Sequence, residues 1–161
     1  MINIQYSSLL ELLNNYNHFI LQIKDKYLQL LSLLTNVEDI SEEKFMETIM
    51  NISNMGGIIM IGYVSKPDSI DFKIVCSGTL IIEPKIIHGC KKVGHIEDIV
   101  VRTDFRGQNL SQNILFLLRK YAKENDCYKV ILDCKEEVKK VYLKNGFEQK
   151  GLQMALYFNN N

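Results

Sequence analysis

The chain has 161 residues, a length typical of a single folded domain. Hydrophobic residues make up 47% of it and charged residues 24%, which indicates a globular protein and excludes a disordered one. Its 19 basic and 19 acidic side chains cancel, so there is no general reason to expect a nucleic acid or an anionic membrane as partner.

The first part of the chain is predicted to be helical. Helical periodicity covers residues 7–17, 25–34 and 41–52, and the short apolar run 19–23 could be a strand. Ser8 with Glu11 has capping-box spacing, and Ser41 is the expected N-cap of the third segment. We expect residues 1–18 to form a helical N-terminal extension and residues 19–161 to form one domain.

Strands dominate the middle of the chain. Residues 58–65, 71–83 and 95–101 follow one another with short connections, which favours antiparallel pairing. A long helix (106–124), a strand (128–134), a short helix (136–145) and a last strand (152–158) follow, and Gly146 stands where a C′ glycine belongs. The order predicts one mixed α/β (α+β) domain, with helices flanking a mostly antiparallel sheet.

The four cysteines give no sign of a metal site. Cys76, Cys90, Cys127 and Cys134 contain no CxxC pair and no zinc-like spacing with histidine. No secretory leader pattern and no apolar run of membrane-spanning length is present. These features predict reduced thiols, no metal and a cytoplasmic location.

Two adjacent carboxylates, Glu97 and Asp98, stand inside the otherwise apolar strand 95–101. In a regular strand they would point to opposite faces, so at most one would face a given ligand. A solvated or salt-bridged pair at a sheet edge would give the same pattern.

A turn that could hold phosphate follows this strand. Arg106-Gly107-Gln108-Asn109-Leu110-Ser111 leads directly into the long helix. A helix N-terminus presents free N–H groups and partial positive charge, and a glycine beside it lets the backbone approach an anion. The other glycines of a P-loop or dinucleotide motif are missing, and an ordinary strand-to-helix turn would look similar.

Taken together, these motifs resemble a known superfamily. The Arg106 turn after "EDIVV", followed by "YKVILDC" and "VYLKNGF", resembles the acyl-CoA-binding core of the GNAT N-acetyltransferases. Within that superfamily "LTNV" (34–37), "KIIH" (85–88), "GHIEDI" (94–99) and "CYKVILDC" (127–134) are similar to the glucosamine 6-phosphate N-acetyltransferase family. The resemblance covers about residues 19 to 158. It implies a GNAT fold with a splayed strand pair and a β-bulge near the carboxylates.

The resemblance also implies a reaction and a cosubstrate. The acetyl group of acetyl-CoA would pass to the amine of glucosamine 6-phosphate, giving N-acetylglucosamine 6-phosphate for UDP-N-acetylglucosamine synthesis. The expected cofactor-binding positions are Ile99, Val100, Val101, Arg106, Gly107, Gln108, Asn109, Leu110, Ser111, Asp133 and Tyr142.

Three side chains are expected to carry the chemistry. Glu97 would remove the proton of the amine through a water molecule, Asp133 would help to position the amine, and Tyr142 would protonate the departing thiolate. Each has an ordinary structural explanation as well: an edge carboxylate, an Asp in a turn and a core aromatic.

The sugar phosphate is expected to meet polar and cationic groups from two subunits. The expected substrate-binding positions are Thr35, Lys85, Ile86, Ile87, His88, Glu97, Asp98, Tyr128 and Lys129, the last two supplied by the partner in a homodimer. This sequence has Val138 where the family has an Asn, and Tyr157 where it has a phosphate-binding Arg. Lys92 or Lys150 could replace that Arg.

Two other functions stay open on the sequence. Tyr157 in place of the Arg would suit a GNAT enzyme that acetylates a protein amine or a polyamine. Asn109, Ser111 and Val138 would suit a CoA-binding domain without catalysis, although Glu97, Asp98, Asp133 and Tyr142 argue against that.

Overall fold

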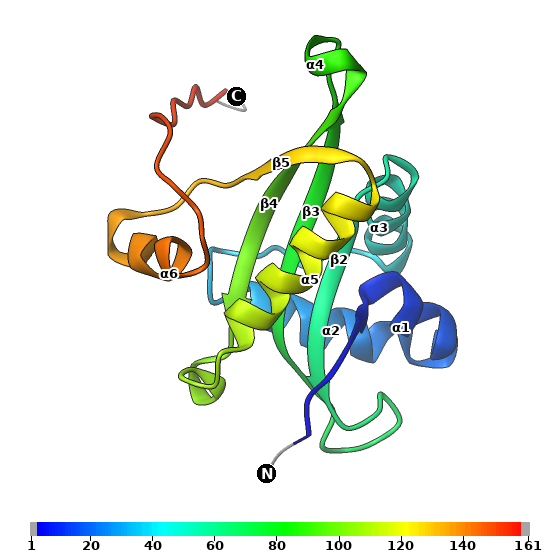
Figure 1. Cartoon of the computed structure of the whole chain (residues 1–161). Helices are drawn as coiled ribbons and strands as arrows, with labels where there is room; N and C mark the ends of the chain where they lie inside the picture. Colours follow the sequence, from blue (N-terminus) through cyan, green and yellow to red (C-terminus); the bar gives the residue numbers. More distant parts are fainter. Residues whose placement is uncertain (1–2, 159–161) are drawn as a thin grey trace.

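The computed structural model describes residues 3–158 and contains one five-stranded sheet (Figure 1). The strands lie in chain order: β1 (Gln5–Ser8), β2 (Ile58–Val64), β3 (Lys73–Pro84), β4 (Lys92–Val101) and β5 (Cys127–Ile131). All neighbouring strands pair antiparallel except β4 and β5, which are parallel. The predicted mixed, mostly antiparallel sheet is therefore confirmed.

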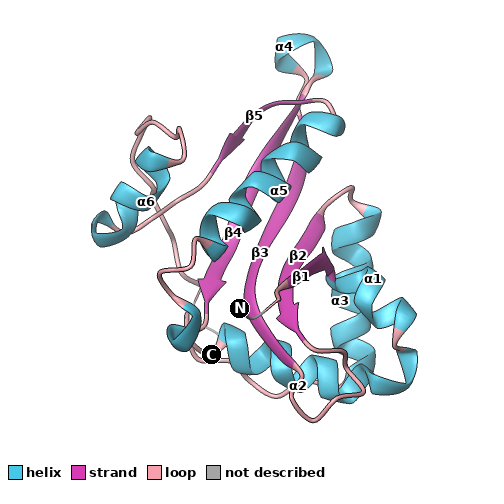
Figure 2. Cartoon of the chain, turned by 60° about the horizontal axis from the view of Figure 1, so that its bottom comes forward, coloured by secondary structure: helices cyan, strands magenta, loops and turns pink. Residues whose placement is uncertain are grey.

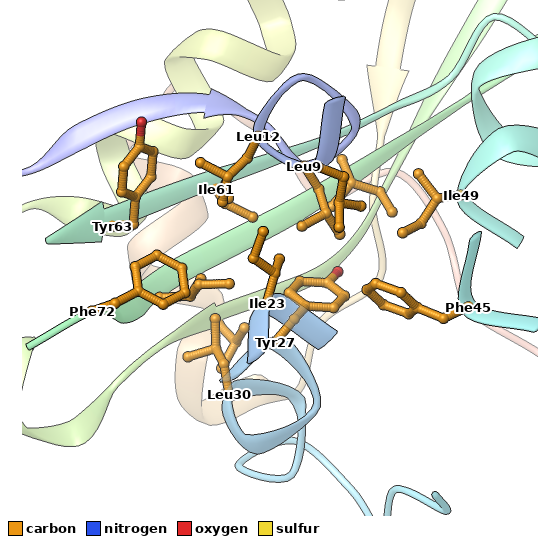
Figure 3. Close-up of a cluster of buried hydrophobic side chains, with 14 residues drawn as sticks. Leu9, Leu12, Ile23, Tyr27, Leu30, Phe45, Ile49, Ile61, Tyr63 and Phe72 are labelled. Carbon is orange, nitrogen blue, oxygen red and sulfur yellow. The ribbon is translucent and has the colours of Figure 1, made fainter. Parts of the chain in front are cut away.

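Helices cover both faces of the sheet (Figures 1 and 2). They are α1 (Leu9–Asn15), α2 (Ile20–Leu31), α3 (Glu42–Asn54), the single turn α4 (Ile87–Cys90), α5 (Leu110–Glu124) and α6 (Lys139–Lys144). α1, α2 and α3 pack on one face, where Figure 3 shows Ile23 and Tyr27 of α2 in one cluster with Ile61 of β2. α5 packs on the other face through Ile114, Leu115 and Leu118. None of the helices within residues 3–158 has the length and apolar character that crossing a bilayer requires.

The N-terminal segment belongs to the sheet and the first core cluster. Residues 5–8 pair with β2, and Ser8 accepts a hydrogen bond of 3.0 Å from the N–H of Glu11, which confirms its role as N-cap of α1. Leu9, Leu12 and Leu13 are buried against α2, α3 and the sheet. Residues 5–15 thus add an edge strand and a helix to the same core.

Two predicted strands are wrong. Residues 20–23 begin α2, because Ile23, Tyr27 and Leu30 recur at helical spacing and are all buried. Residues 152–158 form no strand, and Leu152 and Met154 are 91% and 93% exposed. Alternating apolar residues need a sheet edge to form a strand, and this segment pairs with none in the described chain.

The long helix begins later than predicted, because a turn at Thr103–Phe105 and a loop precede α5. Its contact with the sheet is close. A Cβ placed on Gly78 of β3 would lie 2.7 Å from Ile114 Cγ2 and 3.0 Å from Leu118 Cδ1, both on α5. Only glycine fits at this point, so Gly78 sets how near α5 lies to the sheet.

The substitution Gly78→Ala should therefore destabilise the fold by about 1–3 kcal/mol, because α5 must move outward or its side chains must leave their rotamers. Chemical denaturation of parent and variant measures this difference. Gly151→Ala is the matched control, since no atom lies within 4 Å of its would-be Cβ. An unchanged midpoint for Gly78→Ala would contradict the close packing described here.

Candidate active site

A β-bulge in β4 places the two adjacent carboxylates. Ser77 pairs with Val100 and Thr79 pairs with Glu97, so β4 has one more residue than β3 between these pairs. Asp98 lies in this bulge with a left-handed φ of 52°. Asp is among the residues that tolerate this conformation best. The bulge that the family resemblance implied is thus present at the expected place.

The bulge shifts the alternation of side chains along β4. Ile96 and Ile99 both pack in the cluster next to α5, although regular alternation would put residues three apart on opposite faces. Val100 joins the cluster on the opposite face, next to α2. The extra residue therefore lets Glu97 and Asp98 escape the opposite-face arrangement of a regular strand.

β4 and β5 separate beside these carboxylates. Their pairing runs from Lys92↔Cys127 to His95↔Ile131, so residues 96–101 of β4 pair only with β3 in the described chain. The backbone groups of this stretch that point toward β5 are open to a ligand. This is the predicted splayed pair. One carbonyl is already used, because Arg106 Nε donates to Val101 O at 3.4 Å.

Glu97 lies in an acidic neighbourhood. Partial desolvation raises the pKa of its carboxyl above the usual value, and the charges of Asp98 and Asp133 raise it further, while His95 partly offsets them. Asp133 follows the end of β5, where Gln153 Nε2 donates to its Oδ2 at 2.9 Å. The fold thus brings together Glu97, Asp98 and Asp133, and it makes Glu97 a better proton acceptor than an ordinary glutamate.

A buried tyrosine of α2 lies near the bulge. The Tyr27 hydroxyl accepts a hydrogen bond of 3.5 Å from Ser77 Oγ of β3. Burial raises the pKa of Tyr27, and the charge of Asp98 contributes to the increase. The phenol therefore stays neutral beside the bulge. Sequence reasoning placed Tyr27 in a helix only, since nothing local indicates that α2 crosses the sheet at this point.

Tyr142 lies at the end of α6 and is half-buried against the α5 cluster. Its ring meets Phe147 edge-on, with centroids 6.0 Å apart. Burial raises the pKa of the Tyr142 phenol, and the nearby Cys134 adds to the effect. A phenol with a raised pKa keeps its proton at neutral pH and can donate it to a thiolate.

The loop before α5 has the shape expected of an anion cradle. Gly107 has a φ of 77°, and Asn109, the N-cap of α5, has φ 59° and ψ 20°. The Asn109 side chain makes no capping hydrogen bond, so the first N–H groups of α5 at Leu110 and Ser111 have no side-chain partner there. Asn109 adopts the left-handed conformation that a glycine usually supplies.

The candidate phosphate cation Lys85 is already paired. Its ammonium contacts the carboxylate of Glu83, and the other oxygen of Glu83 lies 2.7 Å from His95 Nε2. These two partners lower the pKa of Glu83. Glu83 and His95 meet because β3 and β4 pair with Ile81 opposite His95, a register that the sequence alone did not reveal.

The side chains of His88, Tyr128 and Lys129 form a second cluster near the other end of the β4–β5 pair. The rings of His88 and Tyr128 lie 4.6 Å apart, and Lys129 Nζ lies 5.4 Å from the Tyr128 ring centre. Lys129 pairs with Val93 of β4, and Glu97 lies four positions further along that strand (97 minus 93). At about 3.3 Å per residue this is about 13 Å along the strand.

The remaining candidates are all exposed side chains: Thr35 at the bend after α2, Ile86 and Ile87 at α4, Val138 before α6, and Tyr157. The structure places none of them in a described contact with the carboxylates. Within residues 3–158 no group of three His, Cys, Asp or Glu side chains could hold a metal ion.

Comparisons with known proteins agree with this geometry. Residues 60–147 match the Acetyltransferase (GNAT) family. The solved structure of glucosamine-6-phosphate N-acetyltransferase from Arabidopsis thaliana superposes with a TM-score of 0.82 and 31% identity, covering 98% of this chain and 99% of that one. The chain belongs to the GNAT family of acetyltransferases.

Its sequence relatives point to one branch of that family. Glucosamine 6-phosphate N-acetyltransferase of Candida albicans is 40% identical over 83% of this chain and 88% of its own length. The Arabidopsis thaliana protein of the same name is 38% identical over 86% of this chain and 93% of its own. The resemblance that the sequence motifs indicated is thereby confirmed.

The raised pKa of Glu97 predicts a gain in stability on its neutralisation. At pH 7 the carboxylate is charged in both states, and the folded state disfavours the charge, so Glu97→Gln should raise the melting temperature. The gain should shrink as pH falls through the folded pKa and vanish below the unfolded value of about 4.3. Thermal unfolding from pH 3.5 to 8 at low salt measures this.

Glu83→Gln is the matched control with the opposite sign. Because the pKa of Glu83 is lowered, its charge stabilises the fold above the unfolded pKa, and this contribution is lost as pH falls through the folded one. The variant should lower the melting temperature slightly at pH 7. A lower melting temperature for Glu97→Gln would mean that Glu97 makes a stabilising ion pair.

Proposed function

We propose that this protein transfers the acetyl group of acetyl-CoA to the amine of glucosamine 6-phosphate, giving N-acetylglucosamine 6-phosphate and CoA. The observation that carries the proposal is the position of Glu97, Asp98 and Asp133 where β4 separates from β5, in a chain whose relatives have this activity in their names. The product is a precursor for UDP-N-acetylglucosamine synthesis, and we expect the enzyme to act in the cytoplasm.

Acetyl-CoA would bind across the opening between β4 and β5. Its pyrophosphate suits the N-terminus of α5 and the loop of Arg106, Gly107, Gln108 and Asn109, where N–H groups and a cation face one anion. Its pantetheine amides and thioester carbonyl suit the open backbone of Ile99 to Val101. The same N–H groups would stabilise the oxyanion that forms during attack.

Two side chains of this chain would transfer protons, and two more would position the sugar. Glu97 takes the ammonium proton of the sugar through a water molecule, which frees the nitrogen lone pair to attack the thioester carbon. Asp133 holds the amine and Asp98 orients the sugar. When the carbon–sulfur bond breaks, the thiolate takes a proton from Tyr142, and the second proton that the nitrogen loses as the amide forms restores the phenol.

The phosphate of the sugar would be bound by the second group of residues, supplied from the partner subunit. His88, Tyr128 and Lys129 form that group, which lies about 13 Å along β4 from Glu97 of the same chain. Lys150 pairs with Glu148 at 2.7 Å, which makes it a weaker candidate for the missing Arg at position 157.

A homodimer would also cover the C-terminal segment. Leu152, Met154, Leu156 and Phe158 alternate with smaller or polar positions, and each is 79% exposed or more. A second copy of the chain is the occupant we propose for this apolar face, because β5 lies at the sheet edge and exposes Tyr128 and Ile131 nearby.

The acceptor is tested by following free thiol while acetyl-CoA is offered with different amines. Glucosamine 6-phosphate should give rapid CoA release, with glucosamine, a polyamine and a lysine peptide at least tenfold slower, because the latter three lack the phosphate. A preference for the polyamine or the peptide would assign another acceptor, and binding of acetyl-CoA without turnover on any amine would indicate a binding domain.

The same assay tests the base. Glu97→Gln should lower kcat by about 10²-fold or more, with acetyl-CoA affinity little changed. Turnover equal to the parent would exclude Glu97 as base.

The subunit proposal predicts a dimer by sedimentation at micromolar concentration. The double substitution Met154→Lys and Leu156→Lys should shift the protein toward monomer and reduce kcat/KM for the sugar phosphate, because charge cannot be buried on that face. Ala155→Lys, on the alternate face, is the control and should stay dimeric. A parent protein that is monomeric and fully active would contradict shared active sites.

A further inference from the structure

The short helix α6 has little to hold it in place. It contains six residues, none of which is fully buried, and Val141 and Leu143 are exposed. An isolated helix of this length is not stable in water, so contacts with the rest of the fold must fix it. The position of Tyr142 therefore depends on how α6 is anchored.

The C-terminal end of α6 is ordered by a Schellman motif. Gly146 has a φ of 83° at C′, and its N–H donates to Leu143 O at 3.1 Å. The N–H of Phe147 donates to Tyr142 O, also at 3.1 Å. Tyr142 and Phe147 thus occupy the C3 and C″ positions, whose side chains usually pack together in this motif. Their edge-on ring contact is that packing.

One side chain joins this motif to α5. Arg119, half-buried in the third turn of α5, donates from its Nη1 to the carbonyl of Asn145 at 2.6 Å. Asn145 is the C-cap of α6, where unpaired carbonyls carry the negative end of the helix dipole. In the part of the chain that the structure describes, this is the only hydrogen bond between α5 and residues 136–147.

We propose that Arg119 is a positioning residue for the leaving-group step: it fixes the C-cap of α6 and so holds the Tyr142 hydroxyl where the thiolate departs. This rests on the proposed function, in which Tyr142 is the acid. The N-terminus of α5 would hold the pyrophosphate of the same cosubstrate. Helix α5 would therefore fix the distance between the pyrophosphate-binding loop and Tyr142, which would lie at the thiol end of the cosubstrate.

The test is a double-substitution cycle with Arg119→Gln and Tyr142→Phe. Arg119→Gln should lower kcat about 10- to 100-fold, as expected for a misplaced catalytic group, with the KM for the sugar phosphate changed less than about twofold. In a Tyr142→Phe background the same substitution should have little further effect, because the group it positions is gone. Additive losses, or parent-like kcat for Arg119→Gln, would overturn the proposal.

Two further variants separate positioning from folding. Arg119→Lys retains a cationic donor and should recover part of kcat, and it replaces Arg119→Gln in the cycle if the latter does not fold. Lys120→Gln is the matched control, because Lys120 is the exposed neighbour on α5 and should leave kcat unchanged.

An NMR measurement that needs no catalytic turnover distinguishes a failure of the Arg119 proposal from a failure of the proposed function. Ring signals of Tyr142, assigned through Tyr142→Phe, are compared by NMR in the parent and in Arg119→Gln. A shifted or broadened Tyr142 signal supports the proposal even if the parent acetylates none of the amines. An unchanged signal overturns it whichever acceptor the enzyme uses.

Discussion

One extra residue in β4 is the constraint on which the candidate site depends. With Asp98 in the left-handed region, the alternation of β4 shifts by one position, and the strand can keep Ile99 under α5 and Val100 under α2. The same irregularity accompanies the point where β5 separates from β4. The bulge and the open strand edge thus lie within a few residues of each other on β4, where the proposed cosubstrate and base would meet.

The electrostatics of this site are dominated by its carboxylates. Desolvation and the charges of Asp98 and Asp133 raise the pKa of Glu97, while two candidate cations have other contacts: Lys85 pairs with Glu83, and Lys129 lies over the Tyr128 ring. A positively charged ammonium substrate would relieve the repulsion among the three carboxylates on binding. In the proposed reaction the acidic group would therefore favour the protonated amine as ligand and then accept its proton.

Local signals in the sequence were sufficient for much of the fold. Ser8, Ser41 and Gly146 lie at helix ends as predicted, because caps depend on a few neighbouring residues. The pairs Glu83–His95 and Arg119–Asn145 were not predictable, because strand register and helix docking join residues that are 12 and 26 positions apart. The two adjacent carboxylates of β4 were visible as charges in an otherwise apolar strand, but their bulge and their expected roles came from the family resemblance.

The strand predicted for residues 152–158 is absent because strand formation also depends on a pairing partner. The alternation of Leu152, Met154, Leu156 and Phe158 is a strand pattern, yet its apolar face is exposed in the described chain. Burial of one such side chain is worth about 1.5–3 kcal/mol, so four of them uncovered are a large unfavourable exposure. The His88–Tyr128–Lys129 group lies toward the opposite end of the β4–β5 pair from the carboxylates. A second copy of the chain, as proposed above, would cover the apolar face and could bring this group of one subunit to the carboxylates of the other.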